Sequence, residues 1–247
     1  MSKPTRSPIR DVAAIAGIAP PQSARGEILS WTARIGAVTA DALACLQDTS
    51  LATASGRLTA ATRAKLLSRR HVLVGAPAVY TLTPAGMRVC GVEGLEPSRV
   101  SVANAPHTIA CARAAAALQR RYPDYRVVGE RELRRDERRA GMPLASALLE
   151  RTAGYRTKLH RPDLALWPRT DSCGVPIAIE VELAVKAPRR LAEICRAWAR
   201  SRQVGGVVYL ASPAARRALA RAVEQACAQE RIAVLPLDAM SLLANQE

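Results

Sequence analysis

The sequence contains no phenylalanine, and aromatic residues make up only 3% of its 247 positions. Proteins that bind single-stranded nucleic acid by stacking successive bases need several aromatic side chains. The sequence therefore has few aromatic side chains on which bases could stack. The three tryptophans, Trp31, Trp167 and Trp198, are instead expected to pack in the interior.

Cysteine motifs for metal binding and runs long enough to span a membrane are also missing. None of the six cysteines forms a CxxC pair, and from the positions of the cysteines and histidines we expect no structural zinc site. No signal peptide is recognised, so we expect reduced thiols in a cytoplasmic protein. The longest apolar runs, such as residues 204–211, are too short to cross a bilayer, so no membrane partner is expected.

Acidic residues are few compared with basic ones. Arg and Lys number 36 against 21 Asp and Glu, which gives a net charge of +15. This excess excludes an acidic solvating protein and favours a polyanionic partner, nucleic acid first. Only four of the cations are lysines, which fits either a bias toward arginine codons or phosphate recognition by guanidinium groups. Because 49% of the residues are hydrophobic, a sizeable core is also expected.

The N-terminal region begins with a segment unlike the rest. Residues 1–25 contain four prolines and several basic residues and are predicted to be a flexible basic arm. Residues 26–90 show helical patterns: an apolar face at 28–35, a short helix capped by Thr39, and a third helix at about 53–68.

Two β-like runs follow these helices, at 71–74 and 79–82, with a turn at 75–77 between them. Thr83-Pro84 then begins a further short helix. Three helices followed by a hairpin is the order of a winged helix-turn-helix, and residues 80–86 resemble the wing-to-helix segment of that superfamily.

In a winged helix-turn-helix domain the third helix enters the major groove of duplex DNA. Polar and cationic residues on the outer face of the predicted third helix suit that role. These candidate DNA-binding residues are Ser55, Arg57, Thr59, Thr62, Arg63 and Lys65. The alternative is a solvated helix face on a protein-interaction module.

The second half of the chain alternates helices with strands. Residues 91–105 are predicted to be a linker, and residues 106–247 a second domain. Its predicted helices cover 106–121, 187–202 and 213–229. Its predicted strands cover 125–129, 164–167, 177–184, 206–211 and 232–237. This order indicates an α/β sheet with parallel pairings, so the fold class is α/β, or α+β for the whole chain. The charged run 131–139 is interpreted as a mobile loop that contacts DNA.

One strand of this half carries paired carboxylates. Ile177, Ile179, Val181 and Leu183 share one face of it, and Glu180 and Glu182 share the other. Two carboxylates about 7 Å apart along a strand need solvent, protons or a cation to offset their charge.

A third carboxylate, Asp163, enters the preceding strand, and whether it lies level with Glu180 depends on the strand register. Three oxygen ligands around one point suit Mg²⁺ or Mn²⁺. The expected metal ligands are therefore Asp163, Glu180 and Glu182.

The pattern Pro162-Asp163, a gap, and Glu180-x-Glu182 resembles the PD-(D/E)xK nuclease superfamily. The resemblance implies a restriction-endonuclease-like domain in which Asp163 and Glu180 bind metal. The third position is usually a lysine that polarises the attacking water, but here it is Glu182, which some members of that superfamily also carry. Lys186 and Lys158 are candidates for a migrated catalytic cation.

A second resemblance covers about residues 27–237. The winged helix, a helix bearing His107, the segment Gly129–Leu133, Arg161-Pro162-Asp163 and Ile179-Glu-Val-Glu182 are together similar to the bacterial replication-relaxation family. It implies a role in plasmid or mobile-element replication and DNA relaxation. Glu130 matches an acidic position that recurs in that family.

Further residues are candidates around the predicted site. His107 is interpreted as a capping or packing residue and His160 as a weak candidate for phosphate contact. Arg189 and Arg190 at the start of a helix are candidates for holding DNA phosphates.

Three functions are thus open. The first is a divalent-metal-dependent DNA endonuclease or nickase that binds double-stranded DNA. The second is a catalytically inactive regulator of replication or transcription that uses its second domain for dimerisation or DNA contact. The third is an adaptor for plasmid or mobile-element replication proteins.

Overall fold

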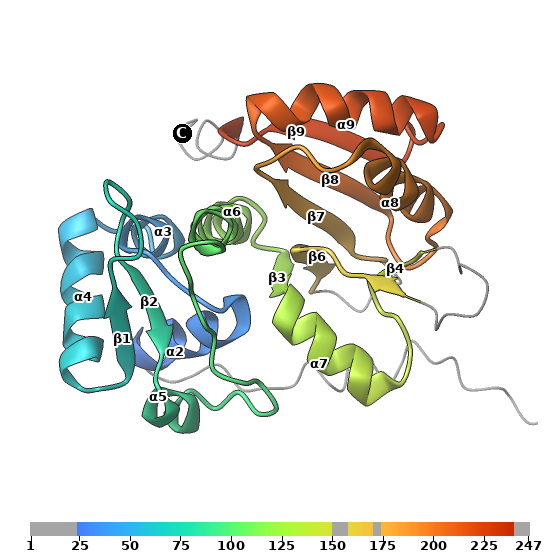
Figure 1. The fold of residues 1–247 in the computed structure, drawn as a ribbon. Coiled ribbons are helices and arrows are strands. Elements are labelled where there is room, and N and C mark those ends of the chain that lie inside the picture. Colours follow the sequence, from blue (N-terminus) through green and yellow to red (C-terminus); the bar gives the residue numbers. More distant parts are fainter. Residues whose placement is uncertain (1–23, 150–157, 170–173, 240–247) are drawn as a thin grey trace, which may run out of the picture.

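The computed structural model describes residues 24–149, 158–169 and 174–239. In this part of the chain the fold is mixed α/β, with eight helices, one five-stranded sheet and two two-stranded ladders (Figure 1). Of the arm predicted at residues 1–25, residues 1–23 lie outside the described part of the chain. Residues 24 and 25 belong to the first described helix.

The N-terminal half consists of helices and one hairpin. Its elements are α2 (Ala24–Ile35), α3 (Ala40–Leu46), α4 (Leu51–Arg63), β1 (Leu67–Arg70), β2 (Val79–Leu82) and α5 (Pro84–Val89). Gly36, with a φ of 104°, ends α2 in a conformation that favours glycine. The predicted caps are confirmed, because Thr39 accepts from the backbone N–H of Ala42 and Thr83 from that of Gly86.

The predicted third helix and first hairpin strand were both placed too far along the chain. α4 ends at Arg63, and Lys65, with a φ of 57°, turns the chain into β1. The strand at 67–70, not 71–74, pairs with β2, starting at Leu67 opposite Leu82. The apolar residues Val72 and Leu73 misled the prediction because they pack against the start of α6 rather than extend the ladder.

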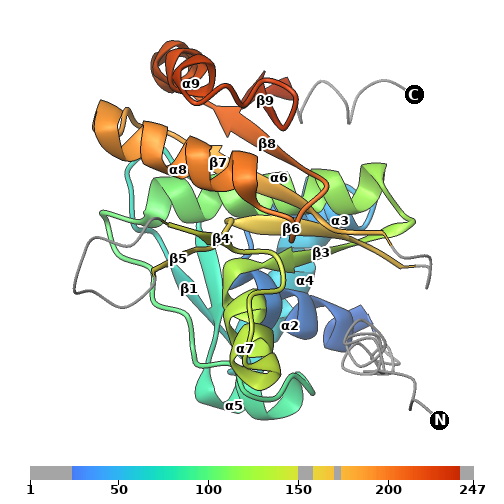
Figure 2. The same cartoon turned by 90° about the vertical axis from the view of Figure 1, so that its right-hand side faces the viewer.

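The C-terminal half follows a segment without helix or strand at 91–104, in which Val92 and Val100 are buried. Its helices are α6 (Ala105–Arg121), α7 (Glu130–Ala140), α8 (Pro188–Arg200) and α9 (Pro213–Gln225). Its strands are β3 (Tyr125–Gly129), β4 (Ala147–Leu148), β5 (Leu159–His160), β6 (Leu164–Pro168), β7 (Ile177–Glu182), β8 (Gly206–Ala211) and β9 (Ile232–Pro236). The short β4–β5 ladder, which was not predicted, lies between α7 and α8 (Figure 2).

The five-stranded sheet has the order β3-β6-β7-β8-β9. The first three strands pair antiparallel, and the parallel pairings that the sequence predicts occur in β7, β8 and β9. One face of the sheet packs against α6, and Ile179 and Val181 of β7 belong to that contact. The other face packs against α7, α8 and α9 around the fully buried Trp198.

The prediction of a mobile loop at 131–139 is wrong, because these residues lie in α7. The helical period is hidden in the sequence since the buried face of α7 is mostly charged. Glu132 is completely buried and forms ion pairs with Arg126 and Arg135. Leu133 is the one apolar side chain among the four that α7 buries.

One contact between the two halves is made by small residues. Ala42 of α3 packs between Ala112 and Ala116 of α6. Arg113 of α6 donates to Asp41 of α3 at 2.5 Å. No helix in the described ranges is long and apolar enough to cross a membrane.

Candidate active site

Asp163 and Glu180 lie beside each other where β6 begins. The antiparallel register pairs Leu164 with Ile179, so one further step sets Asp163 opposite Glu180. The Oδ2 atom of Asp163 accepts a hydrogen bond of 2.8 Å from the backbone N–H of Val181. The register that the sequence left open therefore brings two of the predicted metal ligands together.

Glu180 is 3% exposed and is held by two other side chains. Its Oε1 atom lies 2.7 Å from Nε2 of His160 and accepts a hydrogen bond of 3.2 Å from Nε1 of Trp198. Burial raises the pKa of Glu180, and the hydrogen bond with His160 opposes that rise. His160 thus contacts a candidate metal ligand, a role that its position in the sequence did not reveal.

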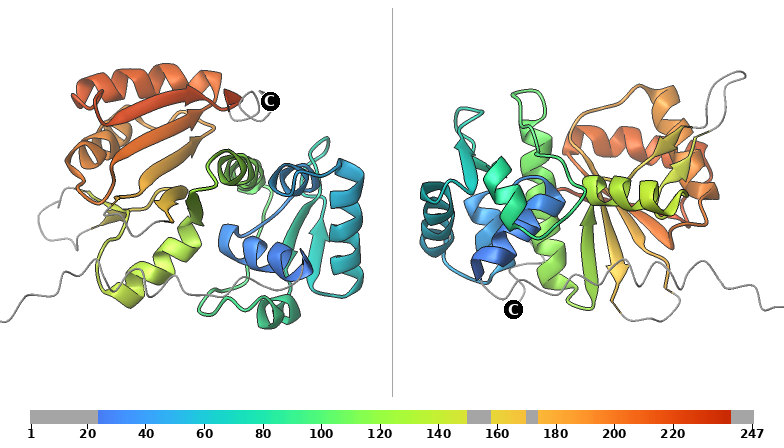
Figure 3. Two further views of the ribbon diagram at one scale, coloured as in Figure 1. Left: turned by 180° about the vertical axis from the view of Figure 1, so that it is seen from behind. Right: turned by 90° about the horizontal axis from the view of Figure 1, so that it is seen from below.

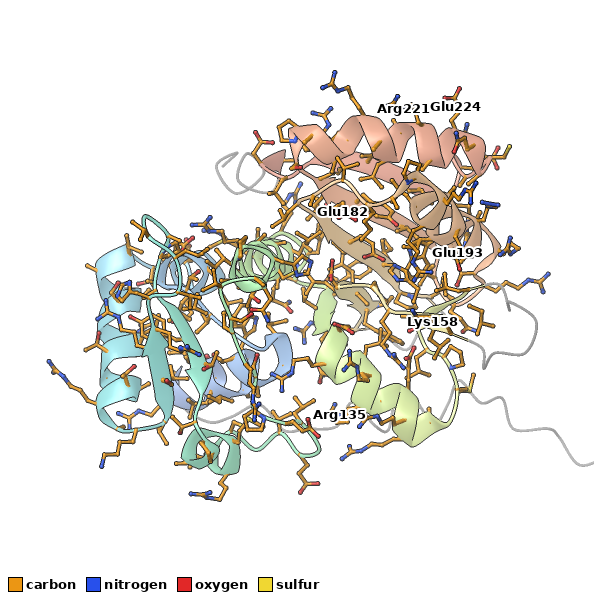
Figure 4. The ribbon with its side chains drawn as sticks, in the orientation of Figure 1. Arg135, Lys158, Glu182, Glu193, Arg221 and Glu224 are labelled. Atoms are coloured by element: carbon orange, nitrogen blue, oxygen red, sulfur yellow. The ribbon has the colours of Figure 1, made fainter. Side chains whose placement is uncertain are left out.

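Glu182 shares a face of β7 with Glu180, as predicted, and is 6% exposed. Its Oε2 atom forms an ion pair with Nζ of Lys186, four residues further along. Lys186 is thus the predicted cation that reaches the carboxylates. Lys158 is exposed before β5, and Figure 4 shows it beside the β4–β5 ladder, apart from Glu182.

His107, interpreted from the sequence as a capping or packing residue, instead contacts one member of the acidic pair formed by Asp163 and Glu180. Its Nε2 atom lies 3.2 Å from Oδ2 of Asp163, and this hydrogen bond is the main cause that raises the pKa of His107. Cys111, one turn further along α6, lies against the same imidazole. The sequence could have indicated that His107 and Cys111 are neighbours, because residues four positions apart lie on the same face of a helix.

The segment before Asp163 is fixed from α7. Arg161 donates to Glu137 at 2.8 Å, and the other oxygen of Glu137 accepts from the backbone N–H of Leu144. The backbone N–H of Glu130 donates to the carbonyl of Asp163 at 2.9 Å, while its side chain forms an ion pair with Arg134. The Glu130 segment therefore approaches Asp163 through its backbone.

The acidic pair has the donor set of a hard-cation site. None of the described residues hydrogen-bonds Oδ1 of Asp163 or Oε2 of Glu180. Two carboxylates that each keep one oxygen unused match the preference of Mg²⁺ and Mn²⁺ for oxygen ligands. The donor chemistry of the two carboxylates therefore suits such an ion, but in the described part of the chain the one close group of three ligand residues joins Asp163 to His107 and Cys111, without Glu180 or Glu182.

The candidate DNA-binding residues form two groups. On α4, Arg57 and Arg63 are exposed, and Lys65 is exposed just beyond its end. Ser55, Thr59 and Thr62 are half-buried. Thr62 donates its hydroxyl to the carbonyl of Leu58, within its own helix. On α8, Arg189 is exposed in the first turn, whereas Arg190 pairs with Glu193.

These two groups lie in different regions of the molecule. α4 forms the outer side of the N-terminal half, and α6 lies between that half and the five-stranded sheet (Figures 1 and 3). The acidic pair and Arg189 belong to the sheet and to α8, beyond α6. Comparisons with protein-family models, with curated proteins and with solved structures found no match to this chain.

Proposed function

We propose that the protein binds duplex DNA through α4 and cleaves it with a divalent metal, Mg²⁺ or Mn²⁺, held by Asp163 and Glu180. The observation that carries this proposal is the position of Asp163 opposite Glu180, with one oxygen on each carboxylate that no described residue hydrogen-bonds. In plasmid or mobile-element replication, such an endonuclease or nickase would relax DNA and meet the replication proteins of that element.

The arrangement of elements supports the proposal. Apart from α7 and the β4–β5 ladder, which come between β3 and β6, the order is α6-β3-β6-β7-α8-β8. Three antiparallel strands with a fourth parallel to the third are expected for a PD-(D/E)xK domain. The order of three helices, a hairpin and a short helix in the N-terminal half is the one expected for a winged helix-turn-helix.

The residues of the site have separate tasks in this proposal. Asp163 and Glu180 would hold the divalent cation, which would supply charge neutralisation at the phosphate and a lowered pKa for a bound water. His160 and Trp198 orient Glu180 through one oxygen, which leaves the other for the ion. Glu182 is a further ligand or the base that accepts the proton of the water, and Lys186 offsets its charge.

The distance between α4 and the sheet bears on where cleavage occurs. Because α6 lies between them, a duplex read by α4 presents a different stretch of its length to the acidic pair. We therefore expect cleavage outside the sequence that α4 contacts. Arg189, exposed at the start of α8, is placed to hold phosphates near the cut.

The test is the conversion of supercoiled plasmid to nicked or linear DNA with Mg²⁺ or Mn²⁺. The unmodified protein should cleave, whereas Asp163→Asn and Glu180→Gln should not, although both should bind a short duplex with unchanged affinity. Glu224→Gln is the matched control, since Glu224 is exposed on α9 (Figure 4). Absence of cleavage by the unmodified protein with every metal and DNA form tested would overturn the proposal.

The second candidate function is a regulator without catalysis. It is favoured by one observation, the pairing of Glu182 with Lys186 at the position where the nuclease superfamily usually has a free lysine. This function predicts DNA binding without cleavage, with the second half serving dimerisation or DNA contact. Sedimentation of the protein with and without DNA would then show a homodimer.

A further inference from the structure

A cluster of three different metal-binding side chains lies on the α6 side of the acidic pair. His107 and Cys111 come from successive turns of α6, and Asp163 comes from the start of β6. The Nε2 atom of His107 is 3.2 Å from Oδ2 of Asp163 and 3.7 Å from Sγ of Cys111. All three ligand atoms lie within 4.8 Å of one another.

Two of the three separations match the edges of a zinc coordination tetrahedron. With bonds of about 2.05 Å to nitrogen or oxygen and about 2.3 Å to sulfur, neighbouring ligands lie about 3.3 to 3.6 Å apart. The His107–Asp163 and His107–Cys111 separations, 3.2 and 3.7 Å, are each within a few tenths of an ångström of these values, and the Cys111–Asp163 separation is within 4.8 Å. Small rotations of the side chains would therefore be enough to admit an ion.

The donor set selects among metals. Imidazole and thiolate ligands suit Zn²⁺ and similar transition metals, whereas Mg²⁺ prefers oxygen alone. The backbone N–H of Val181 donates to the same Asp163 oxygen, as expected for a neighbour that orients a metal ligand. The side chain of His107 is 44% exposed, so an ion can reach the cluster from solvent.

We propose that His107, Cys111 and Asp163 form a binding site for Zn²⁺ or a chemically similar transition-metal ion, with the fourth position open to water. Binding forms a bond between the metal and Sγ of Cys111 and releases the thiol proton to solvent, without any change of oxidation state. Three protein ligands and one open position are typical of zinc sites that take part in reactions rather than purely structural ones.

This site shares a residue with the acidic pair but does not depend on it. It uses Oδ2 of Asp163, and Oδ1 remains for the oxygen-ligated ion beside Glu180. The inference is therefore independent of DNA cleavage. Binding of a transition metal without DNA cleavage would support this inference and count against the proposed nuclease. DNA cleavage without binding of a transition metal would support the nuclease and count against this inference.

The test uses the full chain, stripped of metal with a chelator under reducing conditions, and Co²⁺ alone as the probe. One equivalent of Co²⁺ should bind and give visible bands together with a near-ultraviolet sulfur-to-cobalt charge-transfer band. Zn²⁺ should displace it and raise the melting temperature. Cys111→Ser should abolish the charge-transfer band, and His107→Ala should weaken Co²⁺ binding at least tenfold.

Matched controls separate this site from the other thiols and imidazoles. Cys227→Ser and His71→Ala change residues that are exposed outside the helices and strands, and both variants should bind Co²⁺ like the unmodified protein. Circular dichroism of each variant checks its folding, and Cys111→Ala serves as a second variant if the serine is not tolerated. A Co²⁺ spectrum unchanged by Cys111→Ser, or no stoichiometric binding by the unmodified protein, would overturn the inference.

Discussion

His160 and Glu180 form a largely buried pair, with Nε2 of the histidine 2.7 Å from Oε1 of the glutamate. The same oxygen also accepts from Trp198, so side chains from β5, β7 and α8 meet at one carboxylate. The short strand β5 therefore matters to the site although it contains only two residues.

Replacing His160 with alanine should destabilise the fold by about 2 to 3 kcal/mol, because a buried carboxylate loses a hydrogen-bond partner. Urea denaturation followed by circular dichroism measures this change. The exposed His71, replaced in the same way, should shift the free energy of unfolding by no more than about 0.5 kcal/mol. Equal stability of the two variants would show that the pair contributes nothing.

Glu132 offers a stronger test of the interior. It is fully buried with Arg126 and Arg135, so Glu132→Ala leaves two guanidinium groups without their shared carboxylate. We expect a loss of about 3 to 5 kcal/mol in the free energy of unfolding. Glu130→Ala on the same helix removes only an exposed ion pair and should cost less than about 1 kcal/mol. A small effect of Glu132→Ala would contradict the burial of this network.

The same helix shows why part of the fold could not be predicted. β7 was recognisable because apolar and acidic residues alternate along it, and each face has one kind of neighbour. α7 was not, since Glu132, Arg135 and Glu137 occupy its buried face. Their burial is favourable because they form ion pairs within the helix and with Arg126 and Arg161 outside it. The spacing of hydrophobic residues cannot predict a helix face that is buried through ion pairs.

The site divides in a similar way. The acidic residues were found from sequence because carboxylates on one strand face are unusual. Their proximity was not, because it depends on the register of β6 against β7. The contacts of His107 and His160 with these carboxylates depend on how α6 and β5 pack, which is a property of the assembled fold.

DNA binding through α4 predicts a measurable salt dependence. Arg57→Ala and Arg63→Ala together should lower the slope of log Kd against log salt concentration by about 1.8, because each phosphate contact releases about 0.9 of a counterion. Fluorescence anisotropy with a labelled duplex at several salt concentrations gives the slope. Arg217→Ala with Arg221→Ala, both exposed on α9, is the matched control and should leave it unchanged. An identical slope in the α4 double variant would remove α4 from the DNA interface.

The contact between α3 and α6 should depend on pH through Asp41. Burial alone would raise the pKa of Asp41, but the Thr39 hydroxyl and the Arg113 guanidinium outweigh it and hold the pKa below its usual value. A lowered pKa in the folded state stabilises the protein above the unfolded pKa, about 3.9, and this contribution is lost as the pH falls through the folded pKa. Asp41→Asn should therefore be less stable than the unmodified protein at neutral pH.

That difference should shrink in acid and vanish below the folded pKa of Asp41. Thermal unfolding between pH 3 and pH 7 measures it, and Asp124→Asn, an exposed aspartate outside this contact, is the control. A difference that stays constant down to pH 3 would assign the effect to packing rather than to charge.

Alanines fill the space where α3 meets α6, with Ala42 set between Ala112 and Ala116. A larger side chain at any of these positions would have to displace the helices or the partly buried Trp31, Cys45 and Leu46 that pack against the three alanines. The N-terminal half therefore cannot simply be exchanged for a foreign one. An engineer who changes the exposed face of α4 should leave the α3 residues of this contact unchanged.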